Sequence, residues 1–409
     1  MSLTVHDSSE WLTATYEIDG PESLARRTAE RICVDQTIEA ESNLLPLSLQ
    51  STILGHLEDL RTTAGGRYHA TIRFRGDLLS GECSDLLNLL FGTSSLRGDV
   101  TLLSFTMTNG LLSSWPGPRF GIDGLRQAVG VSCRPLLCAV LKPLGRTPQE
   151  LAELAIQFVE GGVDMIKDDQ SLVDQRWCPF EERVARCAET IVRASIRRGR
   201  PCLYFTHVSG SLDTMRRRAT LAKTLGASGL LVALGLTGFD AMRTLQSDDE
   251  IALPIASHPS MLGTLVDQGR GGLAAPVVYE LLPRLVGSDL NIYPAFGSGY
   301  PMSQQECVSM ADQCRQAWGS IKPIMPAIGG RIGIERHGGA GFGLRSRGHR
   351  CLASRMQQNP EHIVAAMNAL HRTLTESFYY RWSGMASKHS LSLVCFTTRC
   401  ATRSPTKNK

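Results

Sequence analysis

The chain has 409 residues, a formal net charge of +4 and 6% aromatic residues. This length exceeds one small core and indicates one large barrel or two to three domains. Basic residues form no dominant stripe apart from clusters such as "RASIRRGR" and the far C-terminus, which disfavours a nucleic-acid partner. The twelve cysteines show no CxxC pairs, and we find no leader pattern or membrane-spanning apolar run, so we expect reduced thiols in a cytoplasmic protein without a membrane partner.

Residues 1–129 mix strand and helix patterns. Polar and apolar residues alternate in "LTATYEIDG" and "RYHATIRFRGD", which is typical of strands with one exposed face. Between them, "PESLARRTAERICVDQTIE" has a helical pattern. We therefore predict a separate α+β domain over residues 1–129, with "WPGPRFGIDGL" near its end as the linker.

Residues 130–379 alternate short apolar runs with amphipathic stretches, as βα units of a parallel sheet do. One helix, "TPQELAELAIQFVEGG", has Pro148 at its start and a glycine pair behind it. Because no GxGxxG turn follows the first strand, we expect a (β/α)8 TIM barrel rather than an open doubly wound sheet. The predicted strands are "PLLCAVLK", "VDMIK", "PCLYFTHV", "GLLVALG", "ALPIASH", "LNIYPAF" and "KPIMPAIGG".

The eighth unit is missing from this pattern. Residues 336–356, "RHGGAGFGLRSRGHRCLASRM", are basic and glycine-rich without a strand pattern. A helical pattern returns at "PEHIVAAMNALHRTLTES", and we expect residues 380–409 to be a disordered tail. Two interpretations stay open, a disturbed reading frame and a genuine insertion; the first predicts an incomplete barrel.

Polar residues follow the predicted strands at their C-terminal ends, where barrels place catalytic groups. Each has a structural alternative. A lysine and two aspartates can form a surface ion pair, a histidine can be a hydrogen-bonded structural residue, and a glycine pair can be only a turn. The residues concerned are Lys142, Lys167, Asp169, His207, His258, Gly329 and Gly330.

These residues carry a resemblance. The order of domains, "LKPLG" after the first barrel strand and "GGVDMIKDDQ" after the second resemble the RuBisCO large-chain superfamily over residues 12–335. "WPGPRFGIDGLR", "LKPLGRTPQELAELA" and "KDDQSLVDQ" are more similar to the non-carboxylating RuBisCO-like proteins.

The resemblance implies a metal centre. Lys167 would be carbamylated by CO2 and would bind Mg2+ together with Asp169 and the residue that follows, Gln170. A strand with a period of two residues points Lys167 and Asp169 to the same side, and Mg2+ prefers anionic oxygen ligands. Lys142 matches the family's proton-transfer lysine, with His258 as a further catalytic residue.

Three departures argue against carboxylation. Gln170 replaces a glutamate ligand, so the site loses one negative charge. Pro259 stands where carboxylating members have a phosphate-binding arginine, and "FGSGYPMS" lacks their CO2-assisting lysine. Tyr293 aligns with their strand-six histidine. Gly329 and Gly330 would still bind one phosphate, and we place His207 and Tyr293 at the substrate.

The resemblance therefore implies a non-carboxylating lyase that uses Mg2+ and enediolate chemistry. Its substrate would be a phosphorylated keto-sugar acid, decarboxylated or hydrolysed as 3-oxo-isoapionate 4-phosphate is. Alternatives are a methionine-salvage enolase or isomerase and a degenerate, inactive barrel. Members of the family form homodimers in which an N-terminal domain covers the partner's barrel mouth, and Asp35 falls near the acidic residue of that contact.

Overall fold

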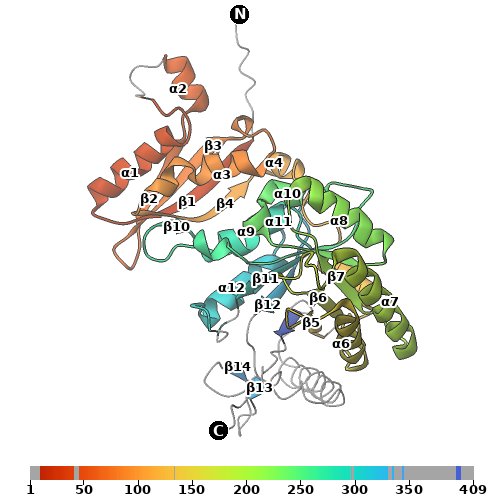
Figure 1. Ribbon diagram of the computed structural model, residues 1–409. Coiled ribbons are helices and arrows are strands. Elements are labelled where there is room, and N and C mark those ends of the chain that lie inside the picture. Colours follow the sequence, from red (N-terminus) through yellow and green to blue (C-terminus); the bar gives the residue numbers. More distant parts are fainter. Residues whose placement is uncertain are drawn as a thin grey trace, which may run out of the picture.

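The computed structural model describes residues 10–40, 46–132, 134–294, 296 and 299–329, without the side chains of residues 48 and 49. It also describes the backbone of three short strands at 334–335, 343–344 and 393–397. An N-terminal domain with an antiparallel sheet precedes a barrel of parallel strands (Figure 1). The predicted (β/α)8 barrel preceded by an α+β domain is confirmed.

Strand β1 lies at the centre of the N-terminal sheet, whose order is β10-β4-β1-β3-β2. It pairs antiparallel with β3 and with β4, and its alternate residues are fully buried. The predicted alternation of "LTATYEIDG" and "RYHATIRFRGD" therefore marks two neighbouring strands. The bounds are β1 Trp11–Ile18, β2 His56–Thr62, β3 Tyr68–Arg75, β4 Val100–Met107, α1 Glu22–Asp35, α2 Leu47–Ile53, α3 Cys83–Phe91 and α4 Asn109–Ser113.

The barrel strands follow the order β11-β12-β15-β5-β6-β7-β8-β9 and close on themselves. Seven of them coincide with the seven apolar runs predicted as strands. Their bounds are β5 Leu136–Leu141, β6 Met165–Asp168, β7 Leu203–His207, β8 Gly229–Val232, β9 Ile255–Ser257, β11 Leu290–Pro294 and β12 Met325–Gly329.

Helices cover the outside of the barrel, and their ends follow local sequence signals. The first, α6 (Pro148–Glu160), begins with a capping box between Thr147 and Glu150. The longest, α7 (Phe180–Arg198), ends at Gly199 in the left-handed conformation. The others are α5 Gly121–Val129, α8 Leu212–Thr224, α9 Leu234–Thr237, α10 Phe239–Gln246, a π-helical turn Val277–Leu281, α11 Leu282–Leu285 and α12 Gln304–Arg315.

The closing strand, β15 (Leu393–Thr397), comes from the segment expected to be a disordered tail. It pairs in parallel with β12 on one side and with β5 on the other. The expectation of a barrel that lacks a strand is therefore wrong, because β15 supplies that strand. The expectation of a disordered tail is wrong for residues 393–397. Within 336–356 the structure describes only β14 (Gly343–Leu344), which pairs antiparallel with β13 (Ile334–Glu335); the rest lies outside the described residues.

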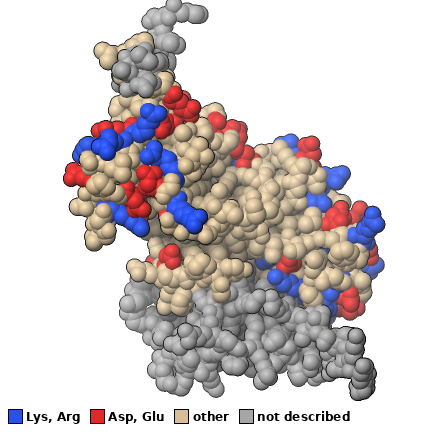
Figure 2. All heavy atoms as spheres, turned by 60° about the vertical axis from the view of Figure 1, so that its left-hand side comes forward, with Lys and Arg blue, Asp and Glu red and all other residues tan. Residues whose placement is uncertain are grey.

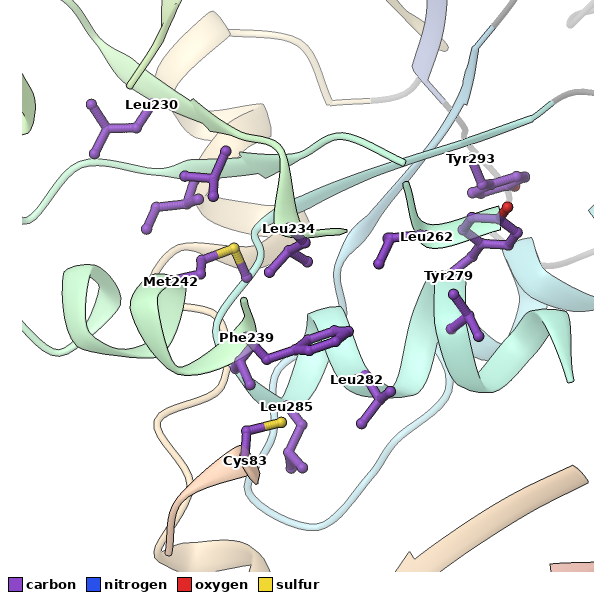
Figure 3. Packing of buried hydrophobic residues seen from close by; sticks show 14 of the residues in the cluster. Cys83, Leu230, Leu234, Phe239, Met242, Leu262, Tyr279, Leu282, Leu285 and Tyr293 are labelled. Carbon is purple, nitrogen blue, oxygen red and sulfur yellow. The ribbon is translucent and has the colours of Figure 1, made fainter. Parts of the chain in front are cut away.

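Several contacts join the N-terminal domain to its own barrel. The loop after β9 contributes β10 (Gly272–Leu273), which pairs in parallel with β4. Asp240 of α10 accepts hydrogen bonds from the backbone N–H groups of Cys83 and Ser84 at the start of α3, at 2.7 and 2.9 Å. Figure 3 shows Cys83 lying toward Phe239 and Leu285 of the barrel. The two parts therefore share apolar packing as well as a sheet.

The predicted linker is also ordered. Its second half forms the start of α5. Phe120 and Gly121 donate their backbone N–H groups to the Asp289 carboxylate, which precedes β11, at 2.6 and 2.8 Å. This segment therefore forms the floor of the barrel.

The distribution of charged side chains and the burial of the cysteines agree with what the composition predicts. On the face shown in Figure 2, positive and negative side chains are interspersed over the N-terminal domain and neither sign forms a continuous band. In the described part of the chain eight cysteines take no part in a disulfide, and all except Cys307 are buried. None of the helices in the described ranges is long and apolar enough to cross a bilayer.

Candidate active site

The strand period explains why the predicted residues meet. Alternate strand residues point into the barrel, where a buried apolar cluster includes Cys138, Met165, Phe205, Ala256 and Ala327. On five of these strands a polar residue or a glycine lies further along the same face. In strand order these residues are Lys142 (with Val140 between), Lys167, His207, His258 and Gly329.

A cavity of about 880 Å³ opens above this inner layer. Six of the predicted residues line it: Lys142, Lys167, Gln170, His258, Tyr293 and Gly329. Asp169 and His207 are not among the lining residues, although Asp169 contacts Lys142; Asp35 is in the N-terminal domain, where it pairs with Arg31 at 2.7 Å. Gly330 lies outside the described residues.

Lys142 and Asp169 form an ion pair at the cavity floor. Lys142 Nζ lies 2.7 Å from Asp169 Oδ2, and the backbone N–H of Ser171 donates to Asp169 Oδ1 at 2.8 Å. Burial of Asp169 alone would raise the pKa of its carboxyl, but the Lys142 ammonium, the Ser171 N–H and Lys167 outweigh burial and lower that pKa. Asp169 is therefore an anion with one oxygen held by the backbone and the other facing a cation.

Lys167 is buried, with 4% of its surface exposed, yet it reaches the cavity. Its Nζ donates a hydrogen bond to the backbone carbonyl of Asp168 at 3.1 Å. The ammonium therefore has a neutral acceptor rather than a carboxylate as its hydrogen-bond partner. This leaves a lysine amine, an ion pair and an open volume side by side.

Asp168 points the opposite way, out of the barrel, and its carboxylate is fully buried. It accepts hydrogen bonds from Tyr204 Oη, Thr206 Oγ1 and the backbone N–H of His207 at 2.8, 2.9 and 3.0 Å. Arg183 Nε lies 3.3 Å away. The three charged residues "KDD" therefore divide between two faces, and the sequence interpretation missed the role of the middle one.

His207 is held entirely by the protein. Because a carbonyl only accepts, the contact of His207 Nδ1 with the Leu172 carbonyl, at 3.2 Å, assigns the proton to Nδ1. Its Nε2 then accepts from Ser209 Oγ at 2.8 Å, and Ser209 accepts from the N–H of Ala233. Burial lowers the pKa of His207 to about 4. We placed His207 at the substrate, but both of its ring nitrogens are engaged by the protein.

His258 is half-buried and faces the cavity. Its Nδ1 accepts a hydrogen bond from the backbone N–H of Ser260 at 3.2 Å, which assigns the proton of the neutral ring to Nε2. Burial, and then the positive charge of Lys167, lowers the pKa of His258 well below its ordinary value. His258 is therefore a neutral hydrogen-bond donor through Nε2.

Tyr293 and Gly329 form the opposite wall. Tyr293 lies out of phase with the inner face of β11, and its hydroxyl donates to the Cys307 carbonyl at 3.4 Å. Burial raises the pKa of Tyr293, so it stays neutral. A Cβ added at Gly329 would lie 2.8 Å from Cγ2 of Ile292, so this close approach of β11 and β12 requires glycine.

The remaining wall was not predicted from the sequence. It comes from the loop after β9, the π-helical turn and the loop before α12, and it includes Met261, Val266, Tyr279, Tyr300 and Met302. Figure 3 shows Tyr279 lying next to Tyr293. Among the described residues that line the cavity, Lys142 and Lys167 supply the basic side chains, and Pro259 follows His258. The wall distant from the lysines also includes two acidic residues, Asp267 and Glu306.

The donor set fits Mg2+ only under one condition. Within the described ranges, no group of three or more His, Cys, Asp or Glu side chains is placed to hold a metal ion. Asp169 offers one carboxylate, Gln170 offers an amide oxygen, and a lysine amine is not a Mg2+ ligand. A carbamate on Lys167 would add the second anionic group and give two negative charges opposite Mg2+. The centre therefore depends on the chemistry of Lys167.

Comparisons with known proteins identify the family. The family described as "Ribulose bisphosphate carboxylase large chain, catalytic domain" matches residues 121–338. Ribulose bisphosphate carboxylase-like protein 1 of Rhodopseudomonas palustris is 32% identical, over 81% of this chain and 88% of its own. The chain belongs to the RuBisCO large-chain family. It is a RuBisCO-like protein, of the non-carboxylating branch.

Other relatives have named activities. A 5-methylthioribulose-1-phosphate isomerase of Rhodospirillum rubrum is 30% identical, over 80% of this chain and 86% of its own. A 2,3-diketo-5-methylthiopentyl-1-phosphate enolase of Exiguobacterium sibiricum is 30% identical, over 77% of this chain and 80% of its own. The crystal structure of a RuBisCO-like protein from R. palustris superposes with a TM-score of 0.73 at 31% identity, covering 79% of this chain and 88% of that one.

Proposed function

We propose that this RuBisCO-like protein catalyses Mg2+-assisted enolate chemistry on a phosphorylated keto-sugar acid, by decarboxylation or hydrolysis of the 3-oxo-isoapionate 4-phosphate type. The supporting observation is that Lys142, Lys167 and a neutral His258 converge on one cavity. Lys167, Asp169 and Gln170 would hold the metal ion. When bound, Mg2+ polarises the carbonyl oxygen of the substrate.

A β-keto acid needs little more than this polarisation of its ketone and a proton donor to lose CO2. When its C–C bond to the carboxylate breaks, the electron pair moves into the ketone and CO2 leaves, so that an enolate must be stabilised and then protonated at carbon. The Lys142 ammonium is placed to return that proton, since it lies at the cavity wall. Nε2–H of His258 can donate a hydrogen bond to the enolate oxygen.

The described lining of the cavity limits how much phosphate charge the site can balance. It includes Lys142 and Lys167 but also Asp267 and Glu306, and Pro259 stands where carboxylating relatives have a phosphate-binding arginine. One phosphate would bind at the backbone of Gly329 and Gly330. This arrangement disfavours ribulose bisphosphate, which carries two phosphates.

A second candidate is supported by the named relatives. An isomerase and an enolase of methylthio-sugar phosphates are each 30% identical to this chain, and both reactions move a proton next to a carbonyl. The same Lys142 and His258 would serve them. Gln170 is the observation against this candidate. The methionine-salvage enolases keep a glutamate at this position and are therefore less similar to this chain there. An inactive barrel is a third candidate, which Mg2+ binding and turnover would exclude.

We further propose a homodimer in which Asp35 lies near the partner's barrel mouth. Asp35 ends α1, and its side chain is 16% exposed beside Arg31. Sedimentation of the purified protein tests the assembly, with a dimer expected and a monomer contradicting it.

The function is tested with purified protein, Mg2+ and bicarbonate. A phosphorylated 3-oxo sugar acid is supplied in deuterated water, and CO2 release and deuteration of the enolate carbon are followed. We expect both, and we expect no fixation of labelled CO2 onto ribulose bisphosphate. Neither event above background, together with tautomerisation of the methylthio diketone, would assign the second candidate instead.

A further inference from the structure

The carboxylate of Asp168 is the centre of a buried polar network that the proposed chemistry does not use. It lies outside the barrel wall between β6, β7 and α7, with no exposed surface. Tyr204 donates to Oδ1, and Thr206 and the backbone N–H of His207 donate to Oδ2. A buried carboxylate with three donors and a guanidinium is well satisfied. It therefore holds β6 to β7 at the residue between Lys167 and Asp169.

The guanidinium of Arg183 extends this network to the loop that follows β6. Arg183 is fully buried, and besides Asp168 it donates to two carbonyls of that loop, Val173 at 3.0 Å and Cys178 at 3.3 Å. His207 donates from Nδ1 to a third carbonyl, that of Leu172. These contacts hold the loop on both sides of its turn, and the loop begins with Asp169 and Gln170.

The network therefore surrounds the site residues without touching the cavity. Lys167 precedes Asp168 and donates to its backbone carbonyl, so a rotation at Asp168 would move both lysine and acceptor. Asp169 follows, and its ion pair with Lys142 depends on the same backbone. A shift of about 1 Å at a reacting group is known to cost orders of magnitude in rate, so such fixing matters to catalysis.

We propose that Asp168, together with Arg183, Tyr204 and Thr206, is a set of positioning residues that fixes Lys167 and Asp169 toward the cavity. This inference rests on the proposed function for its catalytic consequence, but its structural content is independent of the substrate. The competing explanation is that these residues only stabilise the fold. They would then stabilise the whole protein without a special effect on the loop or on metal binding.

Two substitutions separate these explanations because each removes one hydroxyl. Tyr204→Phe deletes the donor to Oδ1, and Thr206→Val deletes a donor to Oδ2 while keeping the shape of the side chain. The matched control is Ser228→Ala, which removes the hydroxyl that accepts from the backbone N–H of Tyr204 at 2.8 Å. Thr206→Ser restores the hydroxyl and serves as the conservative variant.

The first readout is amide hydrogen exchange over residues 167–179 in the metal-free protein. We expect faster exchange there in Tyr204→Phe and Thr206→Val than in Ser228→Ala and Thr206→Ser, at equal global stability. Exchange that is the same in all four variants overturns the inference. If Tyr204→Phe fails to fold, the pair at Thr206 gives the same comparison.

The second readout is Mg2+ affinity by calorimetry in bicarbonate buffer. We expect about tenfold weaker binding in Tyr204→Phe and Thr206→Val, as the loss of a hydrogen bond to a charged group implies, and no change in Ser228→Ala. Unchanged affinity in all variants overturns the inference. A wild-type protein that binds no Mg2+ but shows the exchange difference supports the positioning role and contradicts the proposed metal centre alone.

Discussion

Replacing Lys142 with methionine should tighten Mg2+ binding while it abolishes turnover. The reason is that Lys142 Nζ lies 2.7 Å from Asp169 Oδ2, the carboxylate oxygen that the backbone does not hold. A metal ion that binds this oxygen must displace the Lys142 ammonium. At this separation and an effective dielectric constant of about 20, the attraction of the two charges is roughly 6 kcal/mol before solvation is counted. Solvation and side-chain entropy offset most of that.

The net effect follows from measured hydrogen bonds to charged groups, which contribute about 1.5–3 kcal/mol. We take the lower half of this range, because the Lys142 side chain is 27% exposed and solvent screens its charge. Mg2+ should therefore bind Lys142→Met roughly tenfold more tightly. Methionine keeps the length of the aliphatic chain, so the cavity wall is preserved.

Calorimetric titration of Mg2+ in bicarbonate buffer measures this directly. Lys223→Met is the control, since Lys223 is exposed on α8 and donates to the Glu250 carbonyl far from the cavity. Turnover should be lost in Lys142→Met and kept in Lys223→Met. Equal or weaker Mg2+ affinity in Lys142→Met would refute the reasoning that this lysine competes with the metal for Asp169.

Three further predictions concern other charges. Gln170→Glu should tighten Mg2+ binding by adding an anionic oxygen, and unchanged affinity would place Gln170 outside the coordination sphere. His207, neutral in the fold with its pKa lowered from 6.5 to about 4, should contribute stability that is present above pH 6.5 and lost as the pH falls toward 4. That loss is about 3 kcal/mol, so His207→Gln should show a flatter decline in urea unfolding between pH 7 and 4, and an equal decline contradicts the assignment. Asp164→Ala should cost about 3–5 kcal/mol of unfolding free energy, because the Arg134 guanidinium, bound at 2.7 Å by both carboxylate oxygens, is left unpaired; a loss under about 1 kcal/mol would show that Arg134 finds another partner.

The barrel could be predicted because its strands are apolar on both faces and are separated by helical periods. "PCLYFTHV" contains β7, Leu203–His207, and "VDMIK" overlaps β6, Met165–Asp168. The same period of two residues brought Lys142, Lys167 and His258 to one cavity. Local pattern was sufficient here because parallel strands are buried on both sides.

Features that depend on distant partners could not be predicted. β10 has only two residues, and it exists because β4 offers an edge to them. β15 is short and follows a long divergent stretch, so its pairing with β5 and β12 had no local signal. The outward role of Asp168 could have been suspected from the strand period, but its donors come from β7 and α7.

Histidine roles were the least predictable part of the site. His207 and His258 both follow barrel strands on the inner face, and the sequence does not distinguish them. Their difference lies in their hydrogen-bond partners. The Leu172 carbonyl and the Ser209 hydroxyl engage both ring nitrogens of His207, whereas the backbone N–H of Ser260 engages only Nδ1 of His258. Such tautomer assignments require the folded backbone.

The most direct test of the account is whether Lys167 forms a carbamate. Purified protein is supplied with 13C-labelled bicarbonate, with and without Mg2+, and the carbamate carbon is observed by NMR, with Lys167→Arg measured in parallel. The account predicts a Mg2+-dependent carbamate resonance in the wild type and none in Lys167→Arg. A wild type without the resonance, or a resonance that persists in Lys167→Arg, would contradict it.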